Sequence, residues 1–226
     1  RSGNMSWYQG MTLMYYLENV HIASDHNLID VRFPVQYVIR PYSDEFHDYR
    51  GYSGRIAGGI LKKGDDVLLL PSGFTSKIAS INGPAGETGQ AFPPQSVTIL
   101  LEDKLDLSRG DMIVREKNKP NSTQDIDLMI CWFDSEKALQ QRGKYVIQHT
   151  TQEARCIVKD IQYKLNIETL HRIQDDKTIN MNDIARITIR TTKPLHVDAY
   201  RTNRITGSVI FIDEATNNTV GAGMII

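Results

Sequence analysis

The sequence predicts an all-β protein made of two consecutive small β-barrels, preceded by a short linker helix. Short apolar segments recur with an alternating pattern, a turn signal rich in Gly, Pro, Asn or Asp separates them, and a polar stretch interrupts the series near the middle of the chain. Several short strands with a turn signal between each pair are typical of small barrels. The polar stretch at 117–124 is predicted to separate a first barrel at 28–120 from a second at 121–226.

The first 27 residues are expected to be a linker that contains one short helix over about residues 12–19. Leu13, Met14, Leu17 and Val20 recur at helical spacing, and Thr12 is a suitable residue to cap the helix N-terminus. We interpret this helix as lying on the domain that follows it.

The stretch at 51–73 organises the first barrel, because it contains two strands around a tight corner. Gly58 and Gly59 stand where the backbone must bend, and glycine readily adopts the positive φ that such a bend often needs. A turn at 62–65 leads into a continuous apolar strand, which Pro71 ends. The rest of this barrel is expected to consist of strands at 33–39, 76–81, 97–101 and 112–114 and a loop at 82–94.

The second barrel is predicted from the same alternation. The strand at 126–133 has apolar residues on both faces, so it is expected to be buried on both sides. Further strands are expected at 144–149, 154–165, around 187–189, and at 209–213 and 220–226. The predicted core consists of Phe33, Val35, Tyr37, Ile60, Leu61, Val67, Leu69, Val97, Ile99 and Ile113 in the first barrel, and of Ile126, Leu128, Ile130, Val220, Met224 and Ile225 in the second.

The composition is that of an ordinary globular protein of 226 residues, with 40% hydrophobic and 23% charged residues. The net charge of −1 is balanced along the chain, which disfavours nucleic acid as a partner. The longest apolar runs are far shorter than a membrane span, and no signal-peptide pattern is present, so no membrane partner is expected. Cys131 and Cys156 are predicted to be reduced core residues of a cytoplasmic protein, with a disulfide as the alternative.

One cluster of acidic and histidine residues and three further histidines are the candidates for chemistry. The cluster could bind a metal ion, but an ordinary charged loop is favoured; it consists of Asp44, Glu45, His47 and Asp48. His149 precedes two threonines, yet no oriented third group or oxyanion donor is marked. His171 and His196 are isolated and are expected to be surface or packing residues. We therefore predict no catalytic, cofactor-binding or metal-binding residue in this chain.

Two ordered sets of short pieces carry a resemblance to known families. The first set is GGILKKGDDV (58–67), LSRGD (107–111) and TVGAGMI (219–225). With this set, the two barrels resemble domains II and III of translation GTPases of the elongation factor Tu class.

The second set covers essentially the whole chain and consists of NMSWYQGMTL (4–13), RFPVQYVIRP (32–41), FHDYRGYSGRIAGG (46–59), LPSG (70–73), LSRGDMIV (107–114), PLHVDAYRTNRITGSVIFID (194–213) and TVGAGMI (219–225). These pieces resemble the GTPase-bearing large subunit of bacterial sulfate adenylyltransferase, also found fused to adenylylsulfate kinase. Met11 stands where the family usually has proline, and Ala199 where it often has proline or serine.

The resemblance implies a part in sulfate activation, in which the parent enzyme joins sulfate to the adenylyl group of ATP and releases pyrophosphate, driven by GTP hydrolysis. It assigns GTP and Mg²⁺ to a GTPase domain and ATP to a small sulfurylase subunit. This sequence contains neither the G-x-x-x-x-G-K-S/T phosphate loop nor the Asn-Lys-x-Asp guanine motif. The chain is therefore expected to be the two-barrel portion that follows the GTPase domain, non-catalytic by itself, and a scaffold for that domain and for the small subunit.

The loop at 198–207 is the candidate partner-contact site. It is polar and long for a hairpin, and functional residues often lie on loops that a rigid scaffold positions. We expect it to be exposed and to contact another domain or subunit, because Tyr and Arg are favoured as interface anchors. A solvated loop without a partner is the plain alternative. The candidate contact residues are Asp198, Tyr200, Arg201, Asn203, Arg204 and Thr206.

The sequence is also compatible with two other functions. The chain could be a translation-factor-like module that binds an RNA 3′ end, which a basic stripe on the surface would support. It could also be a stand-alone binding protein, which a large, open, apolar pocket in a barrel mouth would support, although small barrels are usually filled by side chains. The sequence leaves open whether a kinase domain follows, the oligomeric state and the surface that contacts the small subunit.

Overall fold

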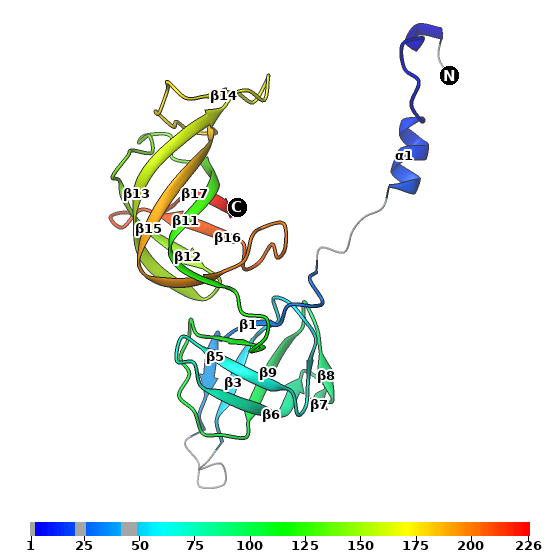
Figure 1. The fold of residues 1–226 in the computed structure, drawn as a ribbon, viewed down its shortest axis with the longest axis vertical. Helices are drawn as coiled ribbons and strands as arrows, with labels where there is room; N and C mark the ends of the chain where they lie inside the picture. Colours follow the sequence, from blue (N-terminus) through cyan, green and yellow to red (C-terminus); the bar gives the residue numbers. More distant parts are fainter. Residues whose placement is uncertain (1–2, 21–25, 42–48) are drawn as a thin grey trace.

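The structure is a computed structural model that describes residues 3–20, 26–41 and 49–226. It contains two bodies built from strands and one short N-terminal helix (Figure 1). The all-β fold class, with two consecutive strand-built bodies after a short helix, is therefore confirmed. The domain limits at 27/28 and 120/121 stay a prediction.

The predicted helix is present as α1, Leu13–Asn19, after a single 3-10 turn, η1, at Gly3–Met5. Thr12 caps it as expected, because its side-chain oxygen accepts a hydrogen bond from the backbone N–H of Tyr15 at 3.2 Å. The expectation that the helix lies on the following domain is wrong, since no residue of α1 is buried. The large exposed side chains of this segment are Met5, Trp7, Tyr8, Met11, Leu13, Met14, Tyr15, Tyr16, Leu17 and Val20.

The first body is an antiparallel sheet in the order β1-β10-β5-β6-β9-β3-β2. Alongside this path, β7 pairs with β6, and β4 pairs with β8. The strands are β1 Arg32–Pro34, β2 Tyr37–Ile39, β3 Gly51–Arg55, β4 Leu61–Lys62, β5 Asp66–Leu70, β6 Thr75–Gly83, β7 Gly86–Thr88, β8 Gln90–Ala91, β9 Ser96–Leu101 and β10 Met112–Val114.

The predicted strand at 33–39 is split into β1 and β2, because two consecutive residues bond to different neighbours. The N–H of Val35 donates to the carbonyl of Asp111, and the N–H of Gln36 donates to the carbonyl of Ser53, both at 2.8 Å. The two ends of the sheet are therefore consecutive on the chain. We expected a closed barrel here, whereas the described strands form a curled sheet whose ends meet through the chain and not through a hydrogen-bonded ladder.

The corner at 51–73 has the predicted glycine bend, turn and apolar strand, but it contains three strands, β3, β4 and β5, and not two. The loop expected after β6 differs from the prediction as well. Gly59 and Gly64 adopt positive φ of 70° and 85°, and β5 ends immediately before Pro71. The expected loop at 82–94 contains β7 and β8, because polar residues there pair with β6 and β4. Their short length and low apolar content explain why the alternation pattern did not mark them.

The second body is a closed six-stranded barrel in the order β12-β16-β17-β11-β15-β13, with β12 paired to β13. The two-residue β14, which the sequence did not reveal, extends it from β13. The strands are β11 Asn121–Trp132, β12 Lys144–His149, β13 Gln152–Leu165, β14 Arg172–Ile173, β15 Ile184–Val197, β16 Ser208–Ile212 and β17 Thr219–Ile225.

Each body has its own core, and most predicted core residues belong to them. Three do not. Tyr37 is exposed because the break before β2 shifts the alternation by one residue, Ile60 is half-buried, and Met224 points outward between the inward Gly223 and Ile225. In the second core, the ring of Tyr145 meets those of Trp132 and Phe211 edge to face, at 5.3 and 6.2 Å between centroids.

The two faces of β11 differ, contrary to the expectation of burial on both sides. Ile126, Leu128, Ile130 and Trp132 are buried, whereas Met129 and Cys131 are half-buried and Phe133, just beyond the strand, is exposed. Both cysteines are free, and only Cys156 is in the core. Its burial raises the pKa of the thiol to about 12, so it is inert as a nucleophile.

Leu128→Ala is expected to lower the free energy of unfolding by ~2–5 kcal/mol, because it opens a cavity in the closed barrel. Met224→Ala, on the neighbouring strand but facing outward, is the matched control and should change it by about 0.5 kcal/mol or less. Urea unfolding followed by the fluorescence of buried Trp132 measures both. Equal effects of the two changes would contradict the assignment of inner and outer faces.

Candidate functional site

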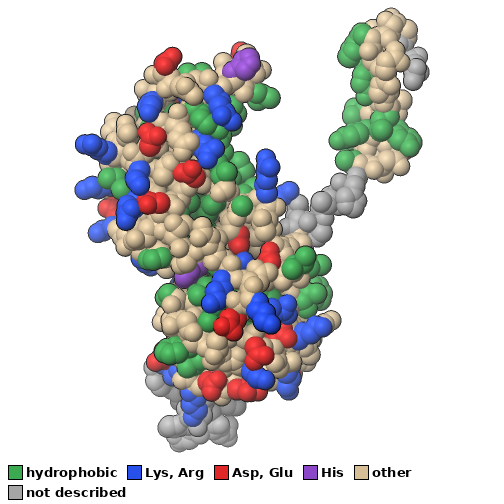
Figure 2. All heavy atoms as spheres, viewed as in Figure 1, with side chains coloured by type: hydrophobic (Ala, Val, Ile, Leu, Met, Phe, Trp, Pro, Cys, Tyr) green, Lys and Arg blue, Asp and Glu red, His purple; other side chains and the backbone are tan. Residues whose placement is uncertain are grey.

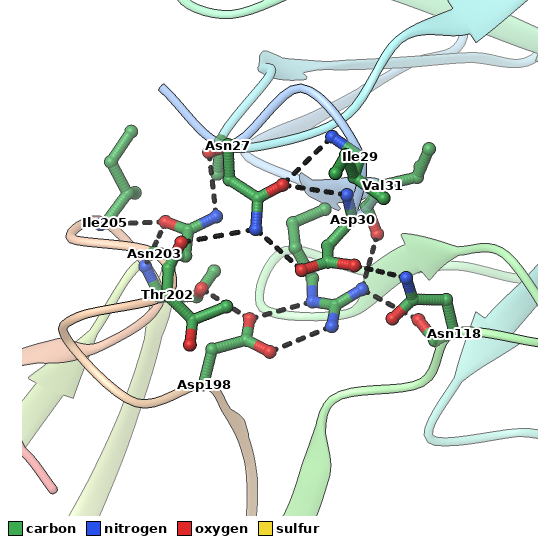
Figure 3. A network of polar contacts seen from close by, with 12 residues as sticks. Asn27, Ile29, Asp30, Val31, Asn118, Asp198, Thr202, Asn203 and Ile205 are labelled. Carbon is green, nitrogen blue, oxygen red and sulfur yellow. Dashed lines mark hydrogen bonds and ion pairs between the residues drawn. The ribbon is translucent and has the colours of Figure 1, made fainter. Parts of the chain in front are cut away.

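The candidate loop lies between β15 and β16 and meets the first body (Figure 3). Our expectation that the whole loop is exposed is wrong. Asn203 and Thr206 are buried, with 3% and 0% of their surface exposed, and the side chain of Asp198 is 9% exposed. Arg201 and Arg204 are exposed and Tyr200 is half-buried. The six candidates thus divide into three whose side chains are buried at the contact, Asp198, Asn203 and Thr206, and three that remain accessible.

A buried ion pair joins the two bodies. Arg32 of β1 is 2% exposed, and its Nε and Nη2 donate to the two carboxylate oxygens of Asp198 at 2.7 and 2.8 Å. Its Nη1 donates to the carbonyls of Val31 and Asn118 at 2.9 and 2.8 Å. Thr206 Oγ1 donates a further 2.6 Å bond to Asp198. A planar guanidinium can form this fork, and a lysine ammonium cannot.

Asn203 makes a second link. Its Nδ2 donates to the carbonyl of Ala57 at 2.9 Å, and its Oδ1 accepts the backbone N–H groups of Ile205 and Thr206 at 2.9 and 3.1 Å. The loop approaches closely because residue 58 is glycine. A Cβ on Gly58 would lie 2.8 Å from Asn203 Nδ2 and 2.5 Å from the carbonyl oxygen of Asp30. The glycine corner of the first body is therefore also a docking surface for this loop.

Asn27, Asp30 and Asn118 support this contact from the connecting segments (Figure 3). Asn27 Nδ2 donates to Asp30 Oδ2 at 2.6 Å and to the carbonyl of Thr202 at 3.2 Å. Asn118, in the segment between the two bodies, donates its Nδ2 to the other oxygen of Asp30. We call these contacts, together with the Arg32–Asp198 and Asn203–Ala57 links, the junction.

Two histidines lie beside the junction. His149, at the end of β12, is 1% exposed and its Nε2 lies 2.8 Å from the carbonyl of Thr206, so Nε2 carries the proton and donates. His196 of β15 is 5% exposed, and its buried Nδ1 has no hydrogen-bond partner. Burial lowers the pKa of both imidazoles below the ordinary value. We expected His171 and His196 to be surface or packing residues; His196 is buried and His171 is exposed.

An apolar groove of about 730 Å³ lies on the outer face of the closed barrel, next to the same loop. Its floor includes a cross-strand row in which Cys131 pairs with Ile184 and Ala222, and Ala222 pairs with Ile210. Tyr200, Arg204 and Ile205 of the loop line it as well. The sequence signal for this groove is the apolar outer face of β11, which predicts burial on both sides of the strand and instead forms part of the groove lining. The groove is not in a barrel mouth.

The described surface gives no further candidate for chemistry. Among residues 3–20, 26–41 and 49–226, no three His, Cys, Asp or Glu side chains are grouped so as to hold a metal ion. The possible metal cluster Asp44, Glu45, His47 and Asp48 lies outside the described residues. No helix in the described part of the chain is long and apolar enough to cross a membrane. Lys and Arg are interspersed with Asp and Glu on the face that Figure 2 shows, without a basic stripe.

Comparisons with known proteins relate the chain to one group of enzymes. Residues 125–226 match the family described as GTP-eEF1A C-terminal domain-like. The whole chain is 44% identical to the bifunctional enzyme CysN/CysC of Mycobacterium tuberculosis and covers 37% of it. It is 43% identical to sulfate adenylyltransferase subunit 1 of Bacteroides thetaiotaomicron and covers 47% of that protein. The chain thus spans less than half the length of these relatives.

Two solved structures share the fold. Sup35 complexed with GDP superposes with a TM-score of 0.77 at 18% identity, over 97% of this chain and 52% of that one. The translation elongation factor SelB of Methanococcus maripaludis, in its apo form, superposes with a TM-score of 0.69 at 17% identity, over 94% of this chain and 45% of that one. Similarity at this identity shows the two-body fold alone.

Arg32→Ala is expected to destabilise the protein by ~3–5 kcal/mol, because Asp198 is left charged and buried without its partner. The double variant Arg32→Ala/Asp198→Ala should recover part of this loss. The control is Arg190→Ala, which breaks an exposed pair with Asp125 and should cost ~0–1 kcal/mol. With the single variant Asp198→Ala added, a double-mutant cycle from urea unfolding measures the coupling between the two side chains. A coupling of about 1 kcal/mol or less, as in exposed pairs, would contradict the role of the junction.

Proposed function

We propose that this chain, which is similar over its whole length to sulfate adenylyltransferase subunit 1, is the two-barrel C-terminal portion of such a large subunit and acts in sulfate activation. The observation that carries the proposal is the sequence identity over the whole chain, which is 44% with CysN/CysC and 43% with sulfate adenylyltransferase subunit 1. The chain covers only 37% and 47% of these two relatives, respectively. The parent reaction would join sulfate to the adenylyl group of ATP, with GTP hydrolysis as the driving force, in the cytoplasm.

The portion is proposed to be non-catalytic. GTP and Mg²⁺ would bind a GTPase domain elsewhere in the parent polypeptide, and ATP would bind a small sulfurylase subunit. Phosphate recognition needs a cradle of backbone amides, usually at a helix N-terminus, with a lysine and a Mg²⁺ ligand. The sequence has no phosphate loop, and its charged residues alternate in sign. The junction supports a scaffold, because paired and bonded groups fix one arrangement of the two bodies.

The N-terminal segment supports a contact with the GTPase domain. A helix of seven residues is marginal in water without tertiary contacts. α1 nevertheless has Leu13, Met14 and Leu17 exposed, along with Trp7 before it. Exposed apolar patches of this kind usually mark an interaction site. We propose that the GTPase domain of the same polypeptide covers them.

The loop at 198–207 supports a contact with the small subunit. Its inner residues hold the junction, while Tyr200, Arg201 and Arg204 stay accessible, and two of these three line the apolar groove. Tyr and Arg on the edge of an apolar depression are the residues that most often anchor protein interfaces. The scaffold and its partner surface would thus share one loop.

Residues 1–226 alone are expected neither to bind GTP tightly nor to make adenylylsulfate. Calorimetry with GTP and Mg²⁺ and a pyrophosphate-release assay with ATP and sulfate test this. Micromolar GTP binding or turnover by the purified chain would overturn the non-catalytic assignment. Joining the chain to the GTPase domain of its parent should give GTP binding, and adding the small subunit should then give sulfate activation.

Tyr200→Ala with Arg204→Ala is expected to leave the melting temperature nearly unchanged and to weaken assembly with the small subunit at least tenfold, since each interface anchor contributes on the order of 1–2 kcal/mol. Sedimentation or calorimetry with the complete large subunit measures the affinity. Tyr37→Ala with Arg109→Ala, an exposed Tyr and Arg on the first body, is the matched control. A large loss of stability with normal assembly would show that the loop is only structural.

A further inference from the structure

His196 occupies an unusual place between the two bodies. On β15 its neighbours Leu195 and Val197 belong to the core of the closed barrel, and successive strand residues point to opposite faces, so the His196 ring points out of that core. The ring is nevertheless 5% exposed. Burial on the outside of a barrel means that another part of the molecule covers the ring.

The turn before β10 of the first body lies at this end of the closed barrel. A Cβ on Gly110 would lie 3.4 Å from the Cβ of Gln152, the first residue of β13. The next residue, Asp111, is the charged group whose field acts on His196. This turn is fixed in the first body, because the N–H of Gly110 donates to the carbonyl of Val35 at 3.0 Å. The first body therefore reaches the end of the closed barrel at which the ring of His196 is covered.

The surroundings of His196 favour the neutral ring. Its Nδ1 has no hydrogen-bond partner, so a proton placed there would be a buried, unpaired cationic donor. The titratable groups that interact with His196 are Asp111 from the first body and His149 from β12, and His149 in turn lies near Asp198 of the junction. Asp111 favours the charged ring, but desolvation is the larger effect, and the pKa of His196 lies below its ordinary value.

We propose that the junction is a pH-sensitive hinge, in which acidification charges His196 and the two bodies separate so that its ring reaches water. When they separate, the ring regains the ordinary histidine pKa of about 6.5. The closed arrangement is thus fully favoured above that value and loses stability as the pH falls from it toward the lower pKa of the closed form. Between about pH 7.5 and about pH 5, the ratio of open to closed molecules rises by up to about thirtyfold.

The experiment uses the variant Asn203→Ala, which lacks the bond to Ala57 and so brings the open form into a measurable range. Residual dipolar couplings of the complete chain show whether both bodies share one alignment tensor. They should share one tensor at about pH 7.5 and have separate tensors at about pH 5. In the wild type, the carbon-13 chemical shifts of the imidazole should show His196 titrating below the ordinary value, and in Asn203→Ala its apparent pKa should rise toward that value.

Two further variants separate this proposal from a general loss of stability in acid. Asn203→Ala with His196→Gln, which cannot take up the proton, should keep one tensor at both pH values. Asn203→Ala with His171→Gln removes an exposed histidine and should open as Asn203→Ala does. The proposal is overturned if His196 takes up its proton while both bodies keep one tensor, if its apparent pKa is the same with and without Asn203, or if the His196→Gln variant opens equally.

Discussion

The bidentate pair between Arg32 and Asp198 is the constraint on which the arrangement of the two bodies depends. It joins residues 166 positions apart in the sequence, and both carboxylate oxygens and all three guanidinium nitrogens are used. A buried pair of this kind contributes little net stability, because removing both charges from water costs about as much as their attraction returns. An arrangement that kept both groups buried but apart would leave two charges unpaired in the interior, which is costly. We therefore interpret the pair as fixing orientation more than adding stability.

The loop at 198–207 and the glycine corner of the first body are two halves of one contact. Asp198 bonds to Arg32 and Asn203 to the carbonyl of Ala57, so the loop reaches the first body at two separate points. Gly207 allows the loop to close on itself, because a Cβ there would lie 2.4 Å from the Cα of Tyr200. Gly58 lets Asn203 approach the carbonyl of Ala57. Two features mark these stretches in the sequence: glycines at a bend and a long polar loop. Both are explained by the close contact between the loop and the corner.

The local features of the fold could be predicted from the sequence, and the junction could not. Thr12 caps a helix that begins at the next residue, and the alternation around Leu128 reflects which face of one strand is buried. Both effects involve only a few consecutive residues, so the sequence pattern there is enough to predict them. The break after Val35 arises because the backbone N–H groups of Val35 and Gln36 donate to different strands or turns of the sheet. A local sequence pattern contains no information about these distant partners. The sequence predicts exposure for Asp198 and Asn203, because their bonding partners lie more than 140 positions away and leave no local signal.

The same loop has an inner and an outer face, and this links the state of the junction to the apolar groove. Asn203 and Thr206 face inward, while Tyr200, Arg204 and Ile205 form part of the groove lining. The backbone between them is short and internally bonded, since the N–H groups of Asn203 and Gly207 donate to Ala199 and Asn203. If one body rotates against the other, there are two possible outcomes for the loop. Asp198 and Asn203 either keep their bonds to Arg32 and Ala57 and follow the first body, or those bonds break. In either case the groove wall would shift relative to its floor on β11 and β17, so a partner seated in the groove would bind one arrangement of the two bodies better than others. A difference in affinity of this kind is what coupling between a partner and a conformational state requires.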